Sequence, residues 1–135
     1  HTADWLSSRG VPVLLPPTFV TPTEAERMSY RDGGDLYIQQ RIEVKHRVDL
    51  AFTGRKDYPY PTLIVDECYK YDNARPKPYL YAIWNADYSC VAVVMNDTHT
   101  HWERVTKPTK QNGQACQFYE VPKEHVIFQQ IPKGK

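Results

Sequence analysis

Proline is the residue that most restricts what this chain can fold into. Eleven of its 135 residues are proline, placed from residue 12 to residue 132, whereas only six are glycine. Each proline lacks a backbone N–H and fixes φ, so it ends or kinks a helix and interrupts a strand ladder. Ten tyrosines, a residue type enriched in strands, add to this bias. We therefore expect short strands joined by stiff loops, with few helices.

Composition and charge narrow the class of protein. Hydrophobic residues make up 41% of the chain and charged residues 24%, which is typical of one globular domain, here spanning residues 1–135. The net charge of +1 gives no global attraction to nucleic acid or to an anionic surface, so such a partner must be recognised by a local patch. The longest apolar runs, 11–15 and 91–95, are too short to cross a bilayer, and no membrane partner is expected.

The cysteines indicate a reducing compartment. Cys68, Cys90 and Cys116 are odd in number and have no Cys-x-x-Cys spacing, which is unlike the disulfide framework of a small secreted domain. We therefore expect a cytoplasmic protein. His99 and His101, even with two of these cysteines, match no closed four-ligand zinc motif.

Hydrophobic periodicity and turn residues predict an α+β protein with a mixed sheet. The first helix is expected to be truncated, because the sequence begins at His1 and not at a methionine. A turn at 85–87 joins the strands on either side of it into a hairpin. Helices are expected at 2–9 and 67–73, and strands at 11–15, 36–38, 41–48, 62–65, 79–84, 89–94, 117–121 and 126–129.

The segment 41–48 alternates between apolar and charged residues as a strand does. Ile42 and Val44 share one side with Val48, and Glu43 and Lys45 share the other. We expect the charged side to face outward from the core. On a strand, residues two apart lie roughly 6 to 7 Å from each other, so Glu43 and Lys45 are neighbours.

A second carboxylate lies within hairpin distance of this strand. Asp35 follows a Gly-Gly turn, and if it begins an antiparallel neighbour of 41–48 its carboxylate meets that of Glu43. Two converging carboxylates form a hard-oxygen site suited to Mg²⁺ or Mn²⁺. The Lys45 ammonium beside them can stabilise charge that develops on a phosphate. The alternative is an exposed Glu43–Lys45 ion pair, with Asp35 as a turn residue.

The acid-x-Lys triplet alone is not specific, since roughly one occurs by chance in a chain of this composition. In its context, however, the Asp35…Glu43-Val44-Lys45 pattern resembles the PD-(D/E)xK nuclease superfamily. The resemblance covers about residues 2–84 and is specific over about fifteen of them. It implies a restriction-endonuclease-like αβββαβ core with extra C-terminal strands, and metal-dependent hydrolysis of DNA phosphodiesters. Asp35 and Glu43 would be the metal ligands and Lys45 the catalytic lysine.

Two positions depart from the family pattern. Gly34 stands before Asp35 where the family name records a proline, and residues 1–10 hold no glutamate although many members carry one on the first helix. The alternative therefore stays open of a catalytically degenerate nuclease-fold protein that serves as a nucleic-acid-binding or protein-interaction module. The small size and loop content suit a phage-encoded protein, which would act in the host cytoplasm.

Positive charge is concentrated just after the candidate strand begins. The cluster can follow a phosphate backbone, which predicts DNA as the partner with RNA as an open alternative, or it can be a solvated basic face. A homodimer is a further expectation, because two strands of a duplex need two sites. The candidate nucleic-acid-binding residues are Arg41, His46, Arg47, Arg55 and Lys56.

Asp66 and Glu67 form a second acidic pair at the end of the predicted strand 62–65. They can supply another acidic ligand. The favoured interpretation is that they start the following helix, where carboxylates interact well with the helix dipole.

Overall fold

The computed structural model describes residues 2–9, 13–14, 37–108 and 113–132. It divides the chain into two compact units, His1–Gln40 and Arg41–Lys135, which are described separately. We call the second of these the C-terminal unit.

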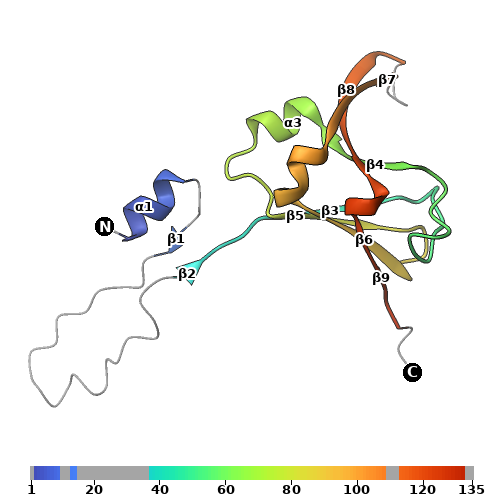
Figure 1. The fold of residues 1–135 in the computed structure, drawn as a ribbon, viewed down its shortest axis with the longest axis horizontal. Coiled ribbons are helices and arrows are strands. Elements are labelled where there is room, and N and C mark those ends of the chain that lie inside the picture. The colour runs from blue at the N-terminus through green and yellow to red at the C-terminus, as the bar shows by residue number, and fades with distance from the viewer. Residues whose placement is uncertain (1, 10–12, 15–36, 109–112, 133–135) are drawn as a thin grey trace, which may run out of the picture. The chain divides into compact units, whose positions relative to one another are not determined.

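The first unit contains a short helix and a two-stranded ladder. Helix α1 spans Thr2–Ser8, and strands β1 (Val13–Leu14) and β2 (Tyr37–Ile38) pair antiparallel (Figure 1). These elements confirm the helix and the two strands expected here. Asp35 lies outside the described residues.

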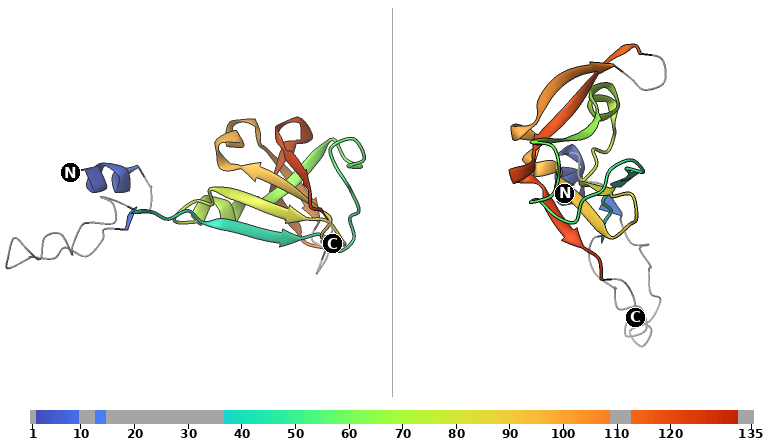
Figure 2. Two further views of the ribbon diagram at one scale, coloured as in Figure 1. Left: turned by 90° about the horizontal axis from the view of Figure 1, so that it is seen from below. Right: turned by 90° about the vertical axis from the view of Figure 1, so that its right-hand side faces the viewer.

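The described part of the C-terminal unit has seven strands in two sheets with few helices, which confirms the α+β class (Figures 1 and 2). The four-stranded sheet has the order β3-β5-β6-β9, with bounds Ile42–His46, Leu80–Trp84, Cys90–Met95 and Ile127–Gln130. The three-stranded sheet has the order β4-β8-β7, with bounds Thr62–Glu67, Ala115–Pro122 and Glu103–Pro108. The helices are α3 (Cys68–Asn73) and the 3₁₀ segments η1 (Asn96–His101) and η2 (Lys123–His125).

The chain passes repeatedly between the two sheets. Strand β3 pairs parallel with β5, and the crossover between them carries β4 and α3, of which β4 belongs to the other sheet. The remaining pairs of the C-terminal unit are antiparallel. Strands that follow each other in the chain, such as β3 and β4, therefore belong to different sheets and form opposite walls of the space between them.

An aromatic-rich core fills this space. On β5 the alternation sends Tyr81 and Ile83 inward, where they are fully buried, and on β4 it does the same for Leu63 and Val65. Trp102 packs edge-on against the Tyr81 ring. The other buried members of the core are Phe52, Tyr58, Tyr71, Cys90, Ala92, Val94, Val121 and Val126.

The hairpin expected around residues 85–87 is present as β5–β6. Its turn depends on Asn85, which is 2% exposed and donates from Nδ2 to the Phe52 carbonyl at 2.8 Å. The Asn85 side-chain oxygen accepts the Cys90 N–H at 3.1 Å. Tyr88 adopts a left-handed φ of 59° to complete the turn.

The alternation predicted for β3 is confirmed, but the expected direction of its faces is wrong. Ile42 and Val44 are 53% and 64% exposed, whereas Glu43 and Lys45 are half-buried. Strand β3 is the edge of its sheet, and its charged side faces the second sheet. Long charged side chains can bury their aliphatic stems and keep their heads in a polar cleft, so the charged face lies inward here.

Two further elements differ from those expected. Asp66 is a residue of β4 and does not start the helix, while Glu67 is the N-cap of α3 and makes no side-chain capping hydrogen bond. Strand β7 was not expected from the sequence.

The three cysteines are free thiols. Among the described residues, no helix has the length and apolar character needed to cross a membrane.

The reversed faces of β3 make a testable prediction about stability. Val44→Thr should change the free energy of unfolding by less than about 0.5 kcal/mol, because the added hydroxyl stays in water. The same isosteric change at the fully buried Val94 on β6 should cost about 1–3 kcal/mol, because it buries a hydroxyl. Urea unfolding followed by tryptophan fluorescence measures both. Equal losses would contradict the assignment of the β3 faces.

Candidate functional site

A close ion pair joins the two sheets. The Nζ of Lys45, on β3, lies 2.6 Å from the Oδ1 of Asp66, on β4. The side chains are 25% and 9% exposed, so the pair is shielded from most solvent. The same ammonium lies 5.4 Å from the centre of the Tyr81 ring. Removing either charge would leave the other partly buried and unpaired, which is costly.

A β-bulge points Asp66 inward. The register between β4 and β8 shifts between Ile64 and Asp66, so Val65 and Asp66 are both buried although they are consecutive. In an unbroken strand these two side chains would lie on opposite faces. Bulges commonly redirect a side chain in this way, and here the redirected group is a carboxylate facing Lys45.

Both carboxylate oxygens of Asp66 are held by protein donors. In addition to Lys45, Oδ1 accepts the Glu67 N–H at 3.0 Å, and Oδ2 accepts the Tyr81 hydroxyl at 3.1 Å. Burial, followed by the negative charges of Asp66 and Glu43, raises the pKa of the Tyr81 hydroxyl, which therefore stays protonated and keeps donating. Asp66 is fixed in orientation and in turn fixes the Lys45 ammonium.

Glu43 is held much more weakly. Its carboxylate accepts one hydrogen bond from Arg41 at 2.9 Å, and this pair is solvent-accessible, with side chains 33% and 43% exposed. Such surface pairs contribute little free energy. Glu43 nevertheless lies close enough to Tyr81 to raise the pKa of its hydroxyl. The structure thus brings two carboxylates near one lysine, one of them rigid and one available to a ligand.

A cleft of about 580 Å³ opens between the sheets at this point, and we call it the Lys45 cleft. Cationic side chains outnumber carboxylates in its lining. Lys70 pairs with Glu67 at 2.9 Å, and Lys107 pairs with Glu120. The lining residues are Lys45, His46, Arg47, Ile64, Asp66, Glu67, Lys70, Lys107, Pro108 and Phe118.

The residues predicted to bind nucleic acid separate into different places. Arg47 lines the Lys45 cleft, where its guanidinium donates to the Ile64 carbonyl at 3.5 Å. The ring of His46 stacks on that of Tyr88 with 4.1 Å between centroids, on the opposite face of β3 from Lys45. Arg55 donates to the Val126 carbonyl at 3.0 Å.

The other two candidates are Arg41 and Lys56. Arg41 is occupied by Glu43, and Lys56 is exposed in the loop that follows β3. The structure therefore brings Arg47 and part of His46 into the lining of the Lys45 cleft, whereas the His46 ring stacks on Tyr88 and Arg55 lies outside the cleft.

The metal site expected from Asp35 and Glu43 is only partly described. Asp35 lies outside the described residues, and β2, which follows it, pairs with β1. Among residues 37–108 and 113–132 no three His, Cys, Asp or Glu side chains lie together as a metal-binding group. The donor chemistry still suits Mg²⁺, because this ion is commonly held by one or two carboxylates together with waters and phosphates.

Sequence reasoning did not identify Lys70 and Lys107 as parts of the site and favoured a different role for Asp66. Lys107 lies on β7, a strand whose charged and exposed sequence shows no hydrophobic alternation. The bulge that directs Asp66 inward depends on the pairing with β8, about 55 residues later in the chain. The one local signal of the role of Asp66 was its position, as an acidic residue at the end of the apolar strand predicted for 62–65.

Comparisons with known proteins give no family to reason from. The chain matches no protein-family model, no curated protein and no solved structure. Its function must therefore be argued from the Lys45 cleft and its surroundings.

The ion pair across the sheets can be tested through stability. Asp66→Asn keeps the shape of the side chain but leaves the Lys45 ammonium without a counter-charge, and should lower the free energy of unfolding by about 1–3 kcal/mol. Glu67→Gln is the matched control: its partner Lys70 is mainly exposed, so a change of less than about 0.5 kcal/mol is expected. Urea midpoints at constant m-value report both. Equal effects would show that the Lys45–Asp66 pair carries no special weight.

Proposed function

We propose that this protein is a divalent-metal-dependent phosphodiesterase that acts on DNA. The observation that carries this proposal is the Lys45 cleft itself. Lys45 shares one face of β3 with Glu43, which does not itself line the cleft, and a bulge in β4 points Asp66 at the lysine. An acidic ligand, an oriented ammonium and surrounding cations are the groups that phosphodiester hydrolysis requires.

The order of elements supports the nuclease-like fold that the sequence resemblance implies. The chain runs through α1, β1, β2 and β3, and then through α3 and β5. This order along the chain follows the αβββαβ pattern, with β4 inserted before α3. The pairing differs from a single core sheet, because β1 pairs with β2, β3 with β5 and β4 with β8. The strands after β5 correspond to the expected C-terminal additions.

The roles of the two described carboxylates differ. Asp66 has both oxygens engaged by protein donors, so it acts as a positioning residue for Lys45. Glu43 makes only an exposed ion pair with Arg41, so its carboxylate can turn toward a cation at little cost in free energy. We propose Glu43 as a metal ligand; Asp35, the second ligand predicted from the sequence, lies outside the described residues. When bound there, Mg²⁺ or Mn²⁺ would polarise the phosphate and lower the pKa of the attacking water.

The protein groups supply positioning and charge. The Lys45 ammonium, held by Asp66 and by the Tyr81 ring, faces the charge that develops on the phosphate oxygens. Arg47 and Lys107 line the same cleft and can contact neighbouring phosphates. Because Asp66 fixes the ammonium before substrate binds, little reorganisation is needed at the moment of reaction.

Cleavage is the direct test. Supercoiled, linear and branched DNA should be cut with Mg²⁺ or Mn²⁺ and left intact with a chelator. Glu43→Gln and Asp35→Asn should abolish activity through loss of the metal, and Lys45→Met should lower the rate by about 10²–10³-fold. Gel assays at matched protein concentration measure each rate.

Control variants distinguish a loss of the catalytic step from a loss of the native fold. Glu124→Gln changes an exposed carboxylate on η2, outside the Lys45 cleft, and should retain full activity. Circular dichroism must show native structure in Lys45→Met, which loses the partner of Asp66. DNA binding without any cutting would contradict the phosphodiesterase and favour a nucleic-acid-binding module. Cutting that persists in all three site variants would show that the activity lies elsewhere.

The cations of the Lys45 cleft predict a salt-dependent affinity for DNA. Each phosphate contact contributes about 0.9 to the slope of log K against log salt, so Arg47→Gln and Lys70→Gln should each flatten the slope by about one. Lys123, on η2, lies outside the cleft, so the control variant Lys123→Gln should leave the slope unchanged. Lys56→Gln tests whether the loop cation predicted from the sequence also contacts phosphate. Fluorescence anisotropy measures the affinity for DNA at salt concentrations from about 50 to about 300 mM.

A further inference from the structure

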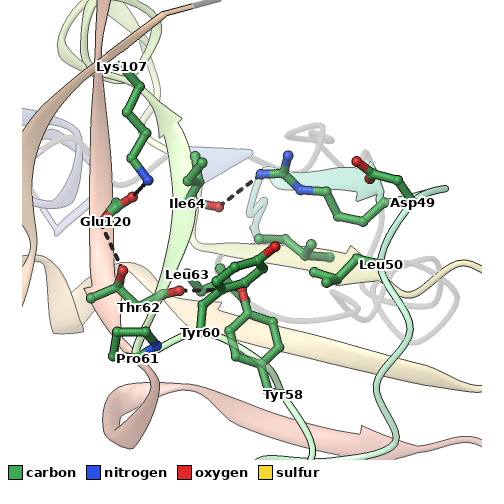
Figure 3. Close-up of a pocket in the computed structure, with 12 residues that line it drawn as sticks. Asp49, Leu50, Tyr58, Tyr60, Pro61, Thr62, Leu63, Ile64, Lys107 and Glu120 are labelled. Carbon is green, nitrogen blue, oxygen red and sulfur yellow. Dashed lines mark hydrogen bonds and ion pairs between the residues drawn. The ribbon is translucent and has the colours of Figure 1, made fainter. Parts of the chain in front are cut away.

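A second pocket adjoins the Lys45 cleft. It has a volume of about 510 Å³ and shares Arg47, Ile64 and Lys107 with the cleft (Figure 3). The two spaces are therefore neighbours, and a ligand that reaches past these shared residues can place its charged part against Lys45 and another part in the pocket. The remaining lining residues are Asp49, Leu50, Tyr58, Tyr60, Pro61, Thr62, Leu63, Ile83 and Glu120.

The pocket has aromatic and aliphatic walls. Tyr58 is buried, and its ring packs edge-on against the ring of Tyr60, with 6.0 Å between centroids and 74° between planes. Tyr60 is 56% exposed, so one face of its ring is open to a ligand. Leu50 and Ile83 add apolar surface. Such a surface accommodates a flat, weakly polar ring.

The loop that carries these tyrosines is held in place. The Asp57 carboxylate accepts N–H bonds from Thr53 and Gly54, both at 2.8 Å, together with the Thr53 hydroxyl at 2.8 Å. The hydrogen bond from the Thr53 side chain is the main cause that lowers the pKa of Asp57, so the carboxylate stays charged at neutral pH. The aromatic wall is therefore preformed before any ligand binds.

Polar groups of both signs also line the pocket. The Glu120 carboxylate accepts the Thr62 hydroxyl at 2.8 Å and pairs with Lys107, while the Arg47 guanidinium reaches the Ile64 carbonyl (Figure 3). The Tyr58 hydroxyl donates to the Thr62 carbonyl at 3.4 Å, and burial raises its pKa to about 12, so it stays protonated in that contact. A neutral ring that bears both N–H and C=O groups suits this mixture. In the pocket the carboxylates Asp49 and Glu120 balance the cations, whereas in the cleft cations outnumber carboxylates, so a phosphate belongs in the cleft.

We propose that this pocket binds a nucleobase of single-stranded or locally unpaired DNA, stacked on Tyr60, while the attached phosphate lies in the Lys45 cleft. This inference rests on the proposed function and adds the form of the substrate. A base inside a duplex is stacked and paired, and must leave the helix to enter a pocket of this kind. Strands that are already unpaired therefore bind with less cost.

A nucleotide probe tests the pocket without any cleavage. In a chelating buffer, isothermal titration should show that dAMP binds more tightly than deoxyribose 5-phosphate, which has the same sugar and phosphate but no base. Tyr60→Ala should weaken dAMP binding by about 5- to 150-fold, which is the range of base–aromatic stacking. Tyr60→Phe keeps the ring and should bind as the wild type does. Tyr69→Ala, at a tyrosine on α3 that is even more exposed than Tyr60, is the control and should change nothing.

Oligonucleotides connect the pocket to the substrate. A single-stranded oligonucleotide should bind more tightly than the same sequence as a duplex, and Tyr60→Ala should remove that preference. If dAMP binds no better than the sugar phosphate, or if Tyr60→Ala leaves the preference unchanged, the pocket proposal is overturned. In that case metal-dependent cutting of DNA by the wild type would leave the proposed function intact. If dAMP binding depends on Tyr60 but no DNA is cut, the phosphodiesterase fails and the nucleobase pocket stands.

Discussion

The ion pair between Lys45 and Asp66 is the interaction on which the arrangement of the C-terminal unit depends. Lysine and aspartate seldom lie away from water, and each is tolerated here because the other neutralises it. The pair joins an edge strand of one sheet to a bulged strand of the other, so it fixes how the two sheets meet. The Tyr81 hydroxyl completes the arrangement from the core side. A site that combines rigid positioning with an accessible cleft follows directly from this one contact.

Parts of this arrangement could be read from the sequence because their signals are local. The β5–β6 hairpin was predicted from two apolar strands around Asn85, and the turn that forms is held by that residue's own side chain. The alternation of β3 was likewise evident, and it correctly placed Glu43 and Lys45 on one face. Its direction could not be read, because a period of two identifies two faces without saying which one meets the core. The usual rule that the apolar side is buried fails at this strand.

Other parts required knowledge of distant pairing. The inward turn of Asp66 comes from a bulge against β8, and no local pattern around Asp66 signals it. Strand β7 is mostly exposed, so its residues carry charge and a terminal proline in place of a hydrophobic repeat. Lys107 reaches the cleft from that strand. The site could thus be predicted to the extent that it resides on β3. The contributions of β4 and β7 needed the three-dimensional structure.

The interleaving of the two sheets has a consequence for how the chain folds. Strand β3 begins the four-stranded sheet and β9, at the far end of the chain, completes it, while β4, β7 and β8 are used for the other sheet in between. Most of the pairings therefore join residues distant in sequence, and such a topology closes slowly, because long loops must be ordered before their contacts form. During synthesis neither sheet can be finished until nearly the whole C-terminal unit has emerged from the ribosome. Until then the apolar strand β6 lacks its neighbour β9 and exposes an unpaired edge. Chaperones bind exposed surface of this kind on nascent chains.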